Sequence, residues 1–169
     1  SLDYTITFKN LPARDAIDIV DIGLPNSNYD LKSISAEING KPATLIRPSE
    51  YVNPGVEIHL GGNAIRAGQT GTLHVYVGKV ERVLGKSTLQ EAEEYASIVI
   101  TPNYFSRDFT RGTTEYFFTI VLPAGLKPEE PRYHTPSGNW PGSDEPVETG
   151  FDNQGRVYYL SLIHISEPT

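Results

Sequence analysis

Apolar and polar residues alternate along most of the chain, which is the pattern of strands that bury one face. The alternation is clear in DYTITFKN (3–10), GVEIHL (55–60) and TLHVYV (72–77), and it returns strongly in TEYFFTIVLP (114–123). Gly and Pro residues separate these runs at short intervals. The pattern therefore predicts an all-β fold, an antiparallel β-sandwich of the immunoglobulin-like or jelly-roll-like kind.

Two local signals refine this prediction. The dipeptide Asn39-Gly40 follows the alternating run ISAEI, and it readily adopts the two positive φ angles of a two-residue hairpin turn. Pro42 comes just after this turn, which predicts an edge strand or the first residue of one. In STLQEAEEY, near residues 87–95, Ser and Gln have the spacing of a capping box, so we expect one short helix there.

The last residues, LSLIHISEPT (Leu160–Thr169), follow GRVYY without a turn or cap. They match the in-frame translation of a transposase adapter used to prepare sequencing libraries, so we expect 160–169 to be a non-native tail on a metagenomic gene fragment. We expect one β-sandwich domain over 1–159, with a parent protein that extends at both ends. LSLIHIS alternates well enough to extend the GRVYY strand, and we expect its removal to cost little stability.

The charge balance excludes one class of partner. The chain has 14 basic and 21 acidic residues and a net charge of −7, and its Lys and Arg residues are scattered. Nucleic-acid binding depends on clustered positive charge, so we expect no nucleic-acid partner. The chain has no Cys, so it contains neither disulfides nor thiolate chemistry, a composition that fits an exported bacterial domain as well as a cytosolic one.

The metal-ligand residues do not form a recognisable site. His59 and His74 occupy outward positions of separate strand-like runs, and no third ligand has a suitable spacing, so we interpret them as exposed strand histidines. Asp15, Asp18 and Asp21 recur every third residue, which on a strand places them on alternating faces. We therefore expect neither a metal nor a cofactor.

No pattern in the chain indicates catalysis. The serines lack the G-x-S-x-G elbow, and GGNAIRAG lacks the residues of a phosphate-binding loop. We therefore expect no enzyme in this chain and no catalytic residues. A hydrolase in which His134 works with an acid such as Asp144 is the least favoured alternative, because it needs the two groups within hydrogen-bond reach.

Aromatic residues gather in two stretches of irregular sequence. One is the long Pro- and Gly-rich segment 124–150, and the other contains Phe109. Exposed aromatic loops on a sandwich can stack on sugars or anchor a protein partner, although a lone Trp can equally cover the end of the sandwich. The candidate binding residues are Trp140, Tyr133, His134, Tyr104 and Phe105.

A series of motifs carries a resemblance to a family. The series is YTITFKNLPARDAIDIVDIGLPNSNYDL, the INGKP hairpin, YVNPGVEIHLGG, AGQTGTLHV, YASIVITPNYF and VLPAGLKPEEPRYH. Together these cover most of Asp3–Tyr159, and they resemble the ectodomains of membrane-anchored bacterial envelope proteins of unassigned activity. The resemblance implies an extracytoplasmic, cell-surface setting and a hydrophobic anchor outside this chain, and it implies no catalytic residues.

Two functions follow as expectations. The first is a non-enzymatic, extracytoplasmic β-sandwich module of a larger envelope protein, with a structural or protein-interaction role. The alternative is a glycan-binding accessory module of an exported enzyme, in which Trp140, Tyr133 and Tyr104 stack on sugar rings. The partners are accordingly a protein or a cell-surface glycan, and a membrane only through the anchor that the chain lacks.

Overall fold

The structure is a computed structural model, and it describes residues 1–86, 96–98, 103, 105–106, 108–127, 129–131 and 145–165. Strands are the main regular structure in this part of the chain, and every sheet in it is antiparallel. The predicted all-β, sandwich-like class is confirmed. The helix expected near 87–95 lies outside the described residues.

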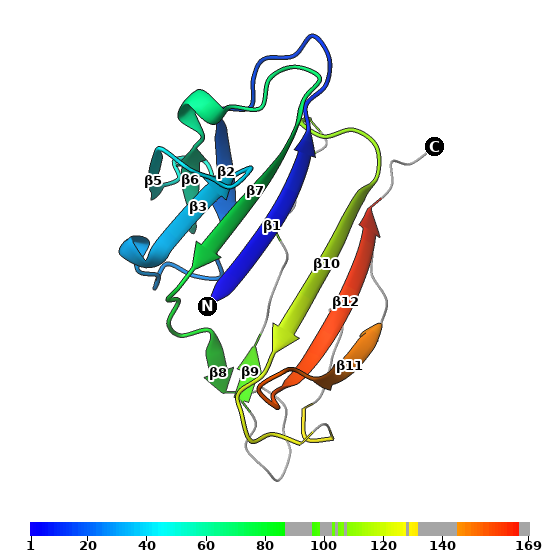
Figure 1. The fold of residues 1–169 in the computed structure, drawn as a ribbon. Helices are drawn as coiled ribbons and strands as arrows, with labels where there is room; N and C mark the ends of the chain where they lie inside the picture. Colours follow the sequence, from blue (N-terminus) through cyan, green and yellow to red (C-terminus); the bar gives the residue numbers. More distant parts are fainter. Residues whose placement is uncertain are drawn as a thin grey trace. The chain divides into compact units, whose positions relative to one another are not determined.

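The chain forms two compact units, Ser1–Asn103 and Tyr104–Thr169. The strands of each unit pair with strands of the same unit only (Figure 1). The single domain expected over residues 1–159 stays a prediction, and the two units are described separately below.

The first sheet of unit 1 has the order β1-β7-β3-β4. Its strands are β1 (Leu2–Lys9), β7 (Thr70–Val77), β3 (Ile34–Ile38) and β4 (Lys41–Pro42). All eight residues of β1 pair with β7, and β3 pairs with the other side of β7, so β7 is central. The long alternating runs thus form the middle of the sheet and one of its edges.

The β3–β4 connection confirms the predicted hairpin. Asn39 has a φ of 51° and Gly40 a φ of 74°, the two positive angles that a two-residue turn of this kind requires. The Thr72 backbone N–H donates to the Asn39 side-chain oxygen at 2.9 Å, which ties the turn to the central strand. Pro42 lies in the edge strand β4, as its missing N–H predicts.

The second sheet of unit 1 has the order β2-β6-β5. Its strands are β2 (Ile19–Gly23), β6 (Gly55–His59) and β5 (Leu45–Pro48). Figure 1 shows this sheet behind the first one. The inward positions of the two sheets and the adjoining Leu60 form the core, whose fully buried side chains are Ile22, Ile38, Val56, Ile58, Leu60, Leu73, Val75 and Val77.

Three short elements complete unit 1. The strands β8 (Leu84–Lys86) and β9 (Ala96–Ile98) form a two-stranded sheet. The 3-10 helices η1 (Leu31–Ser33) and η2 (Gly61–Asn63) connect longer elements. A helix of sufficient length and hydropathy to span a membrane is absent from the described residues.

Unit 2 contains one sheet of the order β10-β12-β11. Its strands are β10 (Thr114–Val121), β12 (Val157–Ile165) and β11 (Glu148–Phe151). The turn between β11 and β12 contains Asp152, Asn153 and Gly155, residue types that favour turns. It is closed by the Gly155 N–H, which donates to the Asp152 carbonyl at 2.9 Å. LSLIHI forms the second half of β12, which continues the GRVYY strand as the alternation predicts.

Candidate functional site

The outer face of the β2-β6-β5 sheet combines charged and apolar side chains. Strand register fixes their order, because residues that pair across the sheet share a face. One row across the three strands is charged and the neighbouring row is apolar on both sides of a histidine. The charged row is Asp21, Glu57 and Arg47, and the second row is Ile19, His59 and Leu45.

Glu57 is the centre of this face. Its side chain points to the outside of the sheet, yet the residue is only 3% exposed. The Arg47 Nε donates to Glu57 Oε1, and His59 Nε2 lies 2.6 Å from the same oxygen. Arg47 also lies 3.8 Å from Glu50, at the exposed end of the network. Arg47 and His59 therefore shield the Glu57 carboxylate from solvent and hold it in one position.

The hydrogen bonds of the network keep Glu57 ionised. The pKa of Glu57 is lowered first by the hydrogen bond with His59 and then by that with Arg47, which together outweigh the effect of its burial. The same contact raises the pKa of Arg47. A carboxyl group held in this state is a poor proton donor, so the arrangement is better suited to fixing charges on a surface than to acid–base catalysis.

Ser49 connects this face to an exposed aromatic residue. The Ser49 hydroxyl donates to Asp21 and accepts the backbone N–H groups of Tyr51 at 3.1 Å and Val52 at 2.9 Å. These bonds fix the start of the loop between β5 and β6. Tyr51, in that loop, is 86% exposed. The outer face thus has an ordered aromatic residue at one end and the apolar side chains of Ile19 and Leu45 at the other.

The other His and Asp residues considered in the sequence do not converge with this network. His74 lies on the other sheet, where its Nε2 is 2.8 Å from Asp3. Asp15 and Asp18 act through their carbonyls, which accept bonds from the Asn10 side chain and the Leu60 N–H. Among the described residues, His, Asp and Glu side chains form no group of three that could hold a metal ion.

Of the predicted aromatic binding residues, only Phe105 is described. Its backbone hydrogen-bonds the Tyr116 hydroxyl, while partial burial raises the pKa of that tyrosine. Phe109, in the same stretch, is 86% exposed. Tyr104, Tyr133, His134 and Trp140 lie outside the described residues, and so does Asp144.

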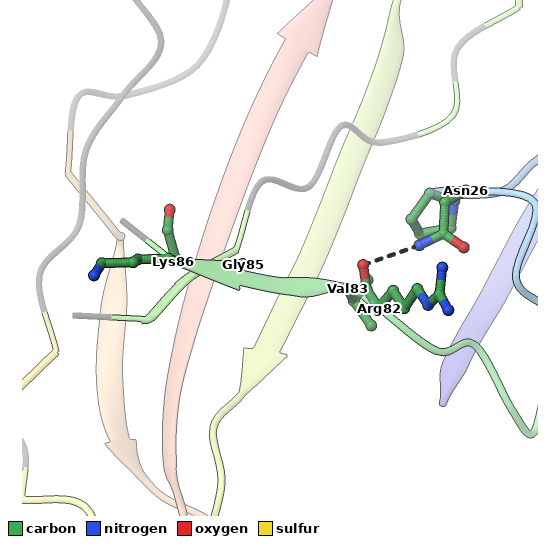
Figure 2. Close-up of a pocket in the computed structure, with 7 residues that line it drawn as sticks. Asn26, Arg82, Val83, Gly85 and Lys86 are labelled. Atoms are coloured by element: carbon green, nitrogen blue, oxygen red, sulfur yellow. Dashed lines mark hydrogen bonds between the residues drawn. The ribbon is translucent and has the colours of Figure 1, made fainter. Parts of the chain in front are cut away.

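A groove on unit 1 was not predicted from the sequence. It has a volume of ≈ 430 Å³ and contains two cationic side chains (Figure 2). Its lining residues are Pro25, Asn26, Arg82, Val83, Gly85, Lys86 and Ser97. They come from the segment after β2, the segment after β7 and the small β8-β9 sheet.

One signal could have revealed the charged network. In GVEIHL the apolar residues point inward, so Glu57 and His59 necessarily share the outer face. The position of Arg47 opposite Glu57 could not be foreseen, because it depends on the register between β5 and β6.

Comparisons with protein-family models, curated proteins and solved structures give no match to this chain.

Proposed function

We propose that the chain is a non-enzymatic, extracytoplasmic β-sandwich module of a larger bacterial envelope protein, with a protein-interaction role. The envelope setting is supported by the resemblance of the motif series between Asp3 and Tyr159. The interaction role is supported by the outer face of the β2-β6-β5 sheet.

The observation that supports binding most directly is the fixed position of Glu57. Its carboxylate is held by Arg47 and His59 on the solvent side of the sheet. The packing of the core, on the other side of the sheet, does not depend on this charge. Next to this network, Ile19 and Leu45 are 42% and 47% exposed. Ordered charges beside exposed apolar groups give a protein partner both specificity and buried area.

A sedimentation assay tests this proposal. The purified chain is mixed with washed bacterial envelope particles, before and after protease treatment of the particles. We expect the chain to sediment with untreated particles and to remain in solution after the treatment. Leu45→Asp should weaken the binding about tenfold, because burying a Leu side chain in an interface contributes roughly the free energy that changes an affinity by that factor.

Tyr76→Asp is the matched control. Tyr76 is 41% exposed and lies on the outer face of the other sheet, so the substitution adds the same charge at a similar exposure. It should leave the binding unchanged, and thermal unfolding should show that both variants fold. Equal loss in the two variants contradicts a role for the β2-β6-β5 face.

The glycan-binding alternative gives a different result. In that case sedimentation survives protease treatment, and soluble polysaccharide abolishes it. Trp140→Ala would then remove the binding that Leu45→Asp leaves intact.

A further inference from the structure

The groove on unit 1 is built around one arginine. Figure 2 shows Arg82 beside Asn26 at one end of β8, with Lys86 at the other end. Arg82 therefore places a positive charge at one end of the groove. This is notable in a chain whose net charge is −7.

Asn26 fixes the backbone that carries Arg82. Its Nδ2 donates to the carbonyl of Glu81 at 2.9 Å and to that of Arg82 at 3.3 Å. Its Oδ1 accepts the N–H of Asn28 at 2.8 Å, and the Asn28 carbonyl accepts the Glu81 N–H at 2.8 Å. The Asn26 Nδ2 thus connects the segment after β2 with the segment after β7, and its Oδ1 forms a hydrogen bond within the first of these segments.

Arg82 has no charge partner among the residues that the structure describes. It has a φ of 55°, a left-handed conformation that non-glycine residues adopt rarely. Its guanidinium forms no ion pair with any residue that the structure describes. The adjacent acid, Glu81, is paired with Lys79 at 2.9 Å. Its carboxylate would have to be shared between Lys79 and Arg82 to neutralise Arg82 as well. The fold therefore fixes the backbone of Arg82, while no described residue compensates the charge of its side chain.

One part of the groove lining, called the floor below, has no side chain, because Gly85 forms it. Gly85 pairs with Ser97 across β8 and β9, and both line the groove. A Cβ added at Gly85 would meet no atom within 4 Å, so the space above it is empty. Pro25 and Val83 add apolar surface, and the Ser97 hydroxyl adds a hydrogen-bonding group.

We propose that this groove binds an acidic side chain of a partner protein, with the carboxylate on Arg82. A guanidinium matches a carboxylate with two parallel hydrogen bonds, and the neighbouring apolar surface accommodates the aliphatic part of a glutamate. This inference specifies the chemistry of the partner, and it depends on the protein-interaction role proposed above. It concerns other residues than Ile19 and Leu45, so the two proposals can fail separately.

Fluorescence anisotropy provides the test. The probe is a short, fluorescein-labelled peptide of alternating Glu and Ala residues, and the matched probe has Gln in place of Glu. The full chain should bind the Glu peptide and not the Gln peptide. The binding should weaken with added salt, because the contact is between exposed charges.

Two variants change the groove without disturbing the fold. Arg82→Asn removes the charge and keeps a residue that tolerates the left-handed backbone, and we expect binding to weaken about tenfold. Gly85→Val fills the open floor and should weaken binding at least as much. The matched controls are Arg14→Asn, at an exposed arginine outside the groove, and Gly62→Val, at a glycine that also has open space around it.

Several outcomes would overturn the inference. They are equal binding of the Glu and Gln peptides, no binding of either, or the same loss in Arg14→Asn as in Arg82→Asn. Competition by inorganic phosphate or glucuronate at lower concentration than the unlabelled Glu peptide would show that the partner is not a protein carboxylate. If envelope sedimentation persists while peptide binding fails, the groove proposal falls and the proposed function stands.

Discussion

Asn103 closes one end of β2 by pairing its side-chain amide with both backbone groups of Gly23. The Gly23 N–H donates to Asn103 Oδ1 at 2.7 Å, and Asn103 Nδ2 donates to the Gly23 carbonyl at 3.2 Å. The amide thus supplies the hydrogen bonds that a neighbouring strand would otherwise make. Asn103 also hydrogen-bonds Tyr4 of β1, whose pKa is raised by burial. One side chain therefore connects the two sheets of unit 1.

Replacing Asn103 should destabilise unit 1. Asn103→Ala leaves two partly buried backbone groups without partners, so we expect the free energy of unfolding to fall by about 1–3 kcal/mol. Urea denaturation measures this change. Asn63→Ala is the control, since no hydrogen bond of the Asn63 side chain is found among the described residues. An equal loss in both variants would contradict the assigned role.

The Glu57 network should make stability depend on pH. The folded state lowers the pKa of Glu57, so its contribution is present above the unfolded value of 4.5 and is lost as the pH falls through the lower folded value. We expect the free energy of unfolding to decrease below about pH 4.5 and this decrease to become smaller in Glu57→Gln. Denaturation series at several pH values measure it. Glu50→Gln, at the exposed end of the network, should retain the wild-type pH dependence.

The β3–β4 turn should be sensitive to loss of its glycine. Gly40 has a φ of 74°, so Gly40→Ala places a Cβ in a strained conformation and should reduce stability by about 1 kcal/mol. Gly62→Ala should be nearly neutral, because Gly62 has no positive φ and an added Cβ meets no atom within 4 Å. Thermal unfolding of the two variants compares them directly. A harmless Gly40→Ala would show that the turn relaxes.

Ser161 should be replaceable with a gain in stability. It is 2% exposed on β12, and its hydroxyl has no hydrogen-bond partner among the described residues. Burying an unpaired hydroxyl is unfavourable, so Ser161→Val should raise the free energy of unfolding by about 1 kcal/mol. Ser35→Val, on an exposed strand position, is the control for β-propensity alone.

Removal of Leu160–Thr169 should nevertheless cost stability, in contrast to the expectation from the sequence. Residues 160–165 pair with Thr114–Thr119 of β10, and Ile163 is only 1% exposed. A chain that ends at Tyr159 loses these contacts. Hydrogen exchange of the Thr114–Thr119 amides should accelerate in the truncated chain while the exchange of β7 amides stays unchanged. Unchanged exchange throughout would restore the original expectation.

The sequence predicts the parts of this fold that depend on local geometry. Alternation identifies strands such as β1 and β7, and Asn39-Gly40 identifies a hairpin, because the backbone needs of each are met by neighbouring residues. The turn at Asp152 is predicted for the same reason. Each of these features could be read within a window of a few residues.

Features that depend on pairing between distant strands could not be predicted. The contact of Arg47 with Glu57 requires the register of β5 on β6, and the groove requires the segments after β2 and β7 to meet. The left-handed backbone of Arg82 could not be predicted either, because this position is neither Gly nor Asn, the residues that usually indicate that conformation. It adopts that backbone where the amide of Asn26 hydrogen-bonds its carbonyl.

The shortness of β4 determines where the first sheet can grow. Beyond β3 the sheet ends in Lys41–Pro42, a two-residue strand in which the proline has no N–H and the lysine is charged. A further strand, from a second molecule or from an aggregate, cannot pair well at this edge. Among the described strands, β1 is the opposite edge of this sheet, so strand addition is favoured at β1 over β4.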